Sequence, residues 1–389
     1  MTAASGYRVD IGRGRSDGTV STQWMNRPED QRYLSLSELH AAVHARAATA
    51  RSRIIETRDI GLEPGEGPDG LALSLEGTAV DFTHWSFGQL ASLAGAPASW
   101  LRRLPARLAA LNLQYGLAAR ESERVQAYVT SGDDGTGGGE LRAMTGPGYG
   151  RILDHELVGA VMRFAGDGTG DTPWKVPGVL DWTRMIHNPH VDVTKETTTL
   201  YASDRDVFLF LVDDTRPIEA GRLPDGSPDL YFRGFYCWNS EVGAARLGLA
   251  TFYLRAVCQN RTLWGVEDFR ELKVRHTRLA PDRFARDVEP ALTRFTQGSP
   301  VGFVQGMAAA RARILARNNE ERTDLLRTLG IPGARVSAML AQAEAEEGRP
   351  PESAYDFVQV ITSSARAEPH QDRRVALERL AGGLLARVQ

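Results

Sequence analysis

The densest set of chemically capable residues lies between Tyr231 and Arg278, where arginines alternate with aromatic side chains. Arginine presents a planar guanidinium that pairs with phosphate or carboxylate through two parallel hydrogen bonds. Aromatic rings beside such cations supply stacking faces for unpaired bases. The residues that we expect to bind nucleic acid are Arg233, Tyr236, Trp238, Arg246, Arg255, Arg261, Lys273, Arg275, His276 and Arg278. In this prediction Tyr236 or Trp238 stacks on bases, and the other residues contact phosphates.

The same pattern has an ordinary structural interpretation. Aromatic residues at alternate positions of a strand usually belong to a hydrophobic core. Arginines close to Glu267, Asp268 and Glu271 can form ion pairs on the surface. For any single residue of the set this structural interpretation is the commoner one, so both interpretations stay open at this point.

Two further groups of residues have the types that bind metals. His187, His190 and Asp192 could bring two imidazoles and a carboxylate to one ion, but zinc normally takes three or four protein ligands. The segment that carries them contains Pro189, which favours a turn, so their spacing does not fix how the three side chains lie relative to one another. A second group of carboxylates borders the apolar run 207–212 and comprises Asp204, Asp206, Asp213 and Asp214. These aspartates could bind Mg²⁺, or they could simply be solvated residues at the ends of a strand.

No signature of a known reaction class is present. The sequence contains no Gly-x-Ser-x-Gly elbow for a nucleophilic serine. The glycine-rich segment 133–139 has no Gly-Lys-Ser/Thr and no helix directly after it, so it does not predict a nucleotide phosphate loop. We therefore predict no cofactor and do not favour an enzyme. A metal-dependent enzyme that uses the 187–192 segment or the aspartate group remains an alternative.

Composition limits the class of protein. The chain has 389 residues, 42% of them hydrophobic, and a formal net charge of −3, so any basic surface must be local. Cys237 and Cys258 lie in apolar runs, which predicts buried, reduced side chains rather than a disulfide framework. There is no signal-peptide pattern and no long uncharged apolar stretch. We expect a cytoplasmic protein without a membrane partner.

The elements that would position the arginine-rich stretch are two β-favouring runs. Residues 231–238 and 247–258 flank a polar, glycine-containing break, which predicts a β-hairpin. The second run also fits a helical stripe, which leaves a helix as the alternative. Both runs are apolar on both faces, as is typical of a central pair of strands covered on both sides.

Serines and aspartates indicate where several helices begin. Ser35 or Ser37 is expected to cap a helix that runs to about residue 47. Ser86 is expected to cap a second helix, and Asp154 a third that extends to about residue 164.

The whole pattern predicts an α+β fold, with an antiparallel-rich twisted sheet and flanking helices, followed by a C-terminal helical region. We expect a flexible N-terminal segment over residues 1–22, an α+β body over 23–280 and the helical region over 281–389. The segments with helical spacing in that last region are 281–295, 303–317, 319–329, 334–345, 353–363 and 373–387.

Several blocks along the chain together resemble a phage- and plasmid-type family known as domain of unknown function 932. The blocks that carry the resemblance include Trp24–Ser35, Asn239-Ser240-Glu241-Val242-Gly243, Cys258-Gln259-Asn260, Arg275-His276-Thr277 and Tyr355–Ser364. The resemblance covers nearly the whole chain and implies a mobile-element context. It implies no activity that transfers residue by residue.

Three functional hypotheses follow. The first is a protein that binds or anneals single-stranded DNA, with a homo-oligomer left open. The second is a non-catalytic structural or host-interaction protein of a mobile element, in which the C-terminal helices offer an apolar docking patch. The third is the metal-dependent enzyme. The first predicts a contiguous basic surface, the second scattered and paired arginines, and the third converging metal ligands.

Overall fold

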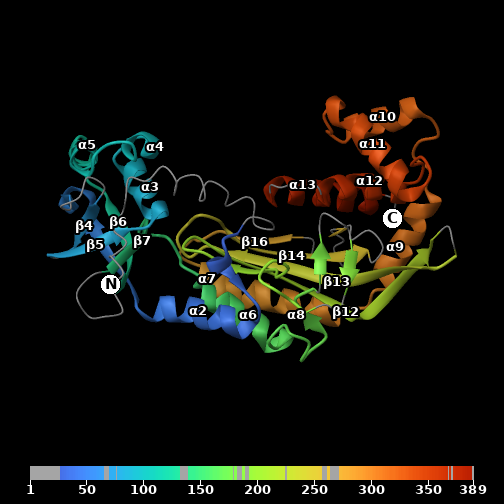
Figure 1. Cartoon of the computed structure of the whole chain (residues 1–389), viewed down its shortest axis with the longest axis horizontal. Helices are drawn as coiled ribbons and strands as arrows, with labels where there is room; N and C mark the ends of the chain where they lie inside the picture. The colour runs from blue at the N-terminus through green and yellow to red at the C-terminus, as the bar shows by residue number, and fades with distance from the viewer. Residues whose placement is uncertain are drawn as a thin grey trace.

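A computed structural model describes residues 27–64, 70–75, 77–131, 139–177, 179–181, 186–188, 192–223, 226–255, 261–262, 271–366, 368 and 371–387. The molecule is elongated, with a small sheet at one end, a larger sheet in the middle and a group of helices at the other end (Figure 1). The predicted α+β class with a C-terminal helical region is confirmed.

The N-terminal lobe is a six-stranded sheet covered on one face by helices. Its strands, in spatial order, are β2 (Ala50–Glu56), β6 (Arg124–Ser131), β7 (Gly139–Thr145), β5 (Thr78–Phe82), β4 (Leu71–Leu75) and β3 (Gly61–Pro64). Only β5 and β7 pair in parallel. The helices are α3 (His84–Leu93), α4 (Ala98–Leu101) and α5 (Ala106–Ala118). Apolar residues of the strands and helices form a core that belongs to this lobe.

The central sheet is built around three long antiparallel strands. Its strands, in spatial order, are β1 (Arg32–Tyr33), β11 (Leu200–Ala202), β12 (Val207–Arg222), β13 (Pro228–Asn239), β14 (Leu247–Arg255) and β15 (Arg261–Thr262); β8 (Trp174–Lys175) also pairs with β12, and β16 (Glu271–Val274) with β14. β9 (Val179–Asp181) and β10 (Ile186–Asn188) form a separate pair. The predicted hairpin is confirmed as β13 and β14, so the helical alternative for the second run is excluded.

One strand is longer than the sequence predicted. The apolar run 207–212 continues as β12 to Arg222, after a register irregularity between Asp213 and Ile218. The residues after Val212 are mostly polar and so did not predict a strand. In this part of β12 the core continues on one face of the sheet, through Ile218 and Ala220, whereas the aromatic layer of the other face ends at Val212.

Helices from both ends of the chain cover one face of the central sheet (Figure 1). They are α2 (Leu36–Ala48), α6 (Asp154–Ala165), α7 (Ala280–Arg283), a π-helical turn (Phe284–Val288) and α8 (Glu289–Gln297). The remaining helices are α9 (Val301–Ala312), α10 (Asn319–Thr328), α11 (Gly333–Glu347), α12 (Ala354–Arg366) and α13 (Gln371–Ala386). Phe303 of α9 stacks on Tyr253 of β14 with 3.8 Å between ring centroids. The C-terminal helices therefore share the core of the central sheet. The domain division at residue 280 remains a prediction.

The helix caps follow the predictions only in part. Ser35 accepts a hydrogen bond from the Glu38 N–H and caps α2, as expected. α3 begins at His84, two residues before Ser86, so its N-cap is Thr83 rather than Ser86. Asp154 is the first residue of α6 and is buried, whereas the exposed side of that helix start is closed by Glu156, which accepts from the Leu153 N–H.

The opposite face of the central sheet is lined by a second aromatic layer. Its buried members are Tyr201, Phe208, Phe210, Val212, Phe232, Tyr236, Ala250 and Phe252. Cys237 is buried on the other face, as the sequence predicted. Among the described residues, no helix is both long enough and apolar enough to span a bilayer.

Candidate nucleic-acid interface and polar junction

Four exposed cations lie at one end of the central sheet, where β14 begins and β16 ends. Leu247 pairs with Val274 in this antiparallel ladder, so Arg246 and Arg275 flank the same rung. We define the basic edge as Arg246, Lys273, Arg275 and Arg278, all of which are exposed. The ladder thus brings Arg246 together with Lys273 and Arg275, which are nearly thirty residues away in the sequence, and Arg278 follows three residues after Arg275 along the chain.

Three of these cations have no acidic partner. Within the described part of the chain, no carboxylate forms an ion pair with Arg246, Arg275 or Arg278. Exposed arginines elsewhere do pair, as Arg163 does with Glu289 at 2.9 Å. Because neighbouring like charges repel each other, unpaired guanidinium groups at one place favour the binding of an anion.

Trp238 lies next to the basic edge on one face of the sheet. It pairs with Gly248, and Gly248 pairs with Lys273. Directly opposed residues of antiparallel strands project from the same face. The indole covers Gly248, where an added Cβ would lie 2.0 Å from the ring, so only glycine fits beneath it. Trp238 is half-buried and keeps part of its ring at the surface.

Tyr236, the other predicted stacking residue, is fully buried. Its ring stacks on Trp238 with 5.6 Å between centroids and packs against Phe208 and Phe252 in the aromatic layer. In this arrangement Tyr236 offers no face to a base. It supports Trp238 from below.

Arg233 lies away from the basic edge, and His276, although it follows Arg275 in the chain, is held by contacts of its own. Arg233 opposes Tyr253, on the face that packs against α8, and its guanidinium donates to the Thr296 carbonyl at 3.3 Å. The His276 ring stacks on Tyr149 at 4.9 Å, and its Nδ1 lies 3.1 Å from the Gly150 oxygen. Burial lowers the pKa of His276. A neutral, stacked imidazole is a poor phosphate ligand.

The other predicted residues are only partly described. The backbone places Arg255 at the end of β14 and Arg261 at the start of β15, where the two strands pair. Of the predicted metal ligands, Asp192 is exposed, His187 is placed in β10 by its backbone and His190 lies outside the described residues. The metal site at these three residues remains a prediction.

The aspartates around β12 have other partners. Asp206 forms two hydrogen bonds, of 2.8 and 2.7 Å, with the guanidinium of Arg27, and both side chains are buried. Asp213 binds Arg216 at 2.6 Å. Throughout the described ranges, no three histidine, cysteine or carboxylate side chains are arranged to hold a metal ion. This finding does not favour the Mg²⁺ interpretation of the aspartates.

A buried polar junction joins the N-terminal lobe to the central sheet at the turn after β13. Arg142 of β7 forms an ion pair with Glu241, and each side chain is almost completely buried. The other oxygen of Glu241 accepts from the Asp154 N–H at 3.1 Å. The Asn239 amide donates to Asp154 Oδ1 and to the Ile152 carbonyl, both at 2.8 Å. We call Arg142, Asp154, Asn239 and Glu241 the polar junction.

The polar junction holds two buried carboxylates but one buried arginine. Burial, and then the nearby charge of Glu241, raise the pKa of Asp154 well above its usual value. Asp154 Oδ2 has no hydrogen-bond partner among the described residues, which suits a protonated carboxyl better than an ionised one. The sequence analysis placed Asp154 at a helix cap and missed this role.

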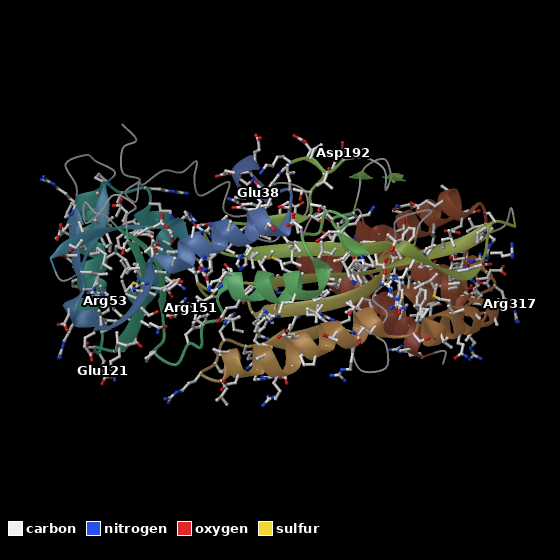
Figure 2. The ribbon with its side chains drawn as sticks, turned by 90° about the horizontal axis from the view of Figure 1, so that it is seen from below. Glu38, Arg53, Glu121, Arg151, Asp192 and Arg317 are labelled. Atoms are coloured by element: carbon white, nitrogen blue, oxygen red, sulfur yellow. The ribbon has the colours of Figure 1, made fainter. Side chains whose placement is uncertain are left out.

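Arg151 borders the polar junction from the lobe side (Figure 2). Its guanidinium lies 4.0 Å from the centroid of the Tyr128 ring and donates to the Glu241 carbonyl. Burial raises the pKa of Tyr128 to about 12. Tyr149 also contributes, because its hydroxyl donates to the Ser240 carbonyl at 2.9 Å.

Three histidines lie close together on α2 and α6. The ring centroids of His40 and His44 are 5.7 Å apart, and His155 lies 5.2 Å from His44 and 6.2 Å from His40. Burial and the two neighbouring imidazoles lower the pKa of His40. The spacing of His40 and His44 on one helix face was a readable signal, whereas the approach of His155 depends on how α6 packs.

A pocket of about 380 Å³ lies between the lobe and the central sheet. Its lining includes Arg46 and His84 together with the carboxylates of Asp30, Glu140 and Asp204. Arg46 donates to the Ser203 carbonyl, and His84 lies 2.8 Å from the Arg205 guanidinium through Nδ1. The lining thus mixes both charges and shows no recognisable catalytic unit.

No family model matches the chain, and neither the curated proteins nor the solved structures contain a match. The resemblance to the phage- and plasmid-type family therefore remains a prediction.

Proposed function

We propose that the protein binds single-stranded DNA at the basic edge. The observation that carries the proposal is the set of three exposed arginines, Arg246, Arg275 and Arg278, without a carboxylate partner among the described residues. Guanidinium groups in water bind phosphate oxygens bidentately, and several together supply most of the affinity for a nucleic-acid backbone.

Trp238 is the feature that favours a single strand over a duplex. Its ring is rigidly supported by Tyr236 beneath and by Gly248 across the sheet. An indole with exposed surface beside phosphate-binding cations can stack on an unpaired base, which a duplex keeps inside. The proposed surface is therefore narrower than the ten residues of the sequence prediction, since it omits the buried Tyr236 and the inward-facing Arg233.

Strand annealing, a homo-oligomeric state and a role in a mobile element are further parts of the same proposal. They require the basic edge to present a strand to a second strand or a second copy. The contacts described here support the binding step alone.

The test is fluorescence anisotropy with a labelled single-stranded oligonucleotide at two salt concentrations. We compare the full chain with the triple variant Arg246→Ala, Arg275→Ala and Arg278→Ala. The wild-type affinity should fall steeply as salt rises, because bound phosphates release counterions. The triple variant should bind more weakly, and its salt slope should be smaller by about 2, since each contact with a single strand contributes roughly 0.7.

A matched control removes three exposed arginines from the C-terminal region, through Arg313→Ala, Arg317→Ala and Arg387→Ala. Arg317 lies at the end of the molecule opposite Arg53, so it is remote from the lobe (Figure 2). The control should keep wild-type affinity and slope. Absence of binding at low salt, or an equal loss in both triple variants, would overturn the proposal.

Trp238→Leu should reduce affinity for the single strand without changing the salt slope.

A further inference from the structure

Helix α5 of the N-terminal lobe is apolar on two opposite sides. Its inner side packs on the lobe core through Ala106, Ala109, Ala110, Leu113 and Leu117, all of which are buried. Its outer side carries Leu108, Leu111 and Tyr115, which are 48%, 60% and 78% exposed. These three residues follow the i, i+3, i+7 spacing and so form one stripe along the helix.

The preceding helix also exposes one large aromatic side chain. Trp100 of α4 is 47% exposed. We define the α5 docking surface as Leu108, Leu111 and Tyr115. The other strongly exposed large hydrophobic residues of the described chain are Leu34, Ile54, Leu279, Val301 and Ile314, which come from separate segments. An ordinary surface helix exposes polar residues on its outer side, so a stripe of this kind indicates a further contact.

The stripe rests on a fixed support. Gly116 allows α5 to lie directly on the end of α3, because a Cβ there would come within 2.2 Å of the Ala94 oxygen. α3 to α5 lie together on one side of the lobe sheet (Figure 1). The outer side of α5 is therefore a preformed surface, which lowers the entropic cost of binding.

The charged side chains of the segment that carries the stripe are of one sign. Residues 82–120 contain no aspartate or glutamate. Arg103 and Arg107 flank the stripe, and both are exposed without an acidic partner in the described ranges. A second copy of this chain would bring an equally basic surface against it, so charge disfavours self-association there.

We propose that the α5 docking surface binds an amphipathic helix of a partner protein, one that presents an apolar face bordered by carboxylates. A single line of large side chains on α5 forms a ridge that fits the groove of one helix. Arg103 and Arg107 would pair with the carboxylates at the rim and set the orientation of the partner helix. This inference is independent of DNA binding, since the basic edge contributes none of its residues.

The probe is a synthetic helical peptide with leucines at i, i+3, i+4 and i+7 and glutamates on both flanks, labelled for anisotropy. The full chain should bind it saturably. Leu111→Gln with Tyr115→Gln should weaken binding by about tenfold or more, because a few central apolar contacts carry most of the binding energy of a protein interface. Arg103→Ala with Arg107→Ala should weaken it less and make it insensitive to salt.

The matched control is Val301→Gln with Ile314→Gln, which removes two exposed hydrophobic residues of the C-terminal region and should leave binding unchanged. A peptide with lysine in place of glutamate should not bind. All variants should retain the wild-type circular dichroism spectrum. Three outcomes would overturn the proposal: no peptide binding, binding only to phosphatidylserine vesicles, or a concentration-dependent increase in mass that Leu111→Gln with Tyr115→Gln abolishes.

Discussion

The polar junction and the basic edge place arginines in opposite electrostatic settings. At the polar junction, Arg142 is 1% exposed and is held by Glu241. At the basic edge, Arg246, Arg275 and Arg278 are exposed and have no acidic partner in the described chain. A buried guanidinium without its carboxylate would be strongly destabilising, whereas an exposed one stays hydrated. The first setting thus serves the fold, and the second leaves the charge available to an external anion.

The largest effect should come from breaking the buried pair. Arg142→Met leaves Glu241 charged and unpaired in the interior. Such a change typically costs about 3–5 kcal/mol, so the free energy of unfolding should fall by that order. Urea denaturation followed by circular dichroism measures it. Because the pair joins the lobe to the central sheet, we also expect the lobe to unfold before the rest of the chain.

A double variant separates the loss of the pair from the loss of packing. Arg142→Met with Glu241→Gln removes both charges and should be more stable than Arg142→Met alone. If the single variant is as stable as the wild type, the polar junction has no structural role, and the contrast with the basic edge fails.

A smaller, pH-dependent effect should come from Asp154→Asn. The pKa of Asp154 is raised in the folded protein above the ordinary value of 3.8, so the folded state binds the proton more tightly than the unfolded chain. The contribution of Asp154 to stability is therefore greatest near or below pH 3.8 and falls as pH rises toward the folded pKa. The amide cannot ionise and still accepts from Asn239.

Thermal unfolding at a series of pH values checks this expectation. The stability of Asp154→Asn relative to the wild type should increase as pH rises from about 4 toward neutrality. A constant difference across that range would show that Asp154 is not protonated preferentially in the folded state.

The smallest effect on stability should come from the basic edge itself. The triple variant Arg246→Ala, Arg275→Ala and Arg278→Ala removes exposed, unpaired charges, and surface changes of this kind usually stay within about 0.5 kcal/mol each. Differential scanning calorimetry should show little change, or a slight gain from reduced repulsion. A large loss would assign these arginines to the fold and remove the main support for DNA binding.

Local sequence patterns predicted the elements well where one pattern dominated. The C-terminal helical segments and the hairpin of β13 and β14 were readable from periodicity. The apolar run of β12 was readable, but its polar extension to Arg222 was not. The helix start at Asp154 was correct, yet the capping role was not, because Asn239 and Glu241 approach from a distant turn.

The candidate sites depended more on distant contacts. The alternation of arginine and aromatic residues identified the right stretch of chain, but strand register distributed its members over two faces of the sheet. Trp238 and Lys273 share one face, whereas Arg233 opposes Tyr253 on the other. The second functional hypothesis placed an apolar patch on the C-terminal helices, whereas the exposed hydrophobic residues that share one helix face in the described chain are Leu108, Leu111 and Tyr115 of α5.

The α+β class, the helical C-terminal region and the apolar strands at the centre could be predicted from the sequence, because periodicity and local hydrogen bonding depend on neighbouring residues. Which arginines are buried with a carboxylate and which remain in water follows from contacts between residues that are distant in the sequence. These contacts join β7 to the turn after β13, and β14 to β16. The residue type gives the charge of a side chain, but the packing around that side chain sets the local dielectric and hence the strength of its electrostatic interactions.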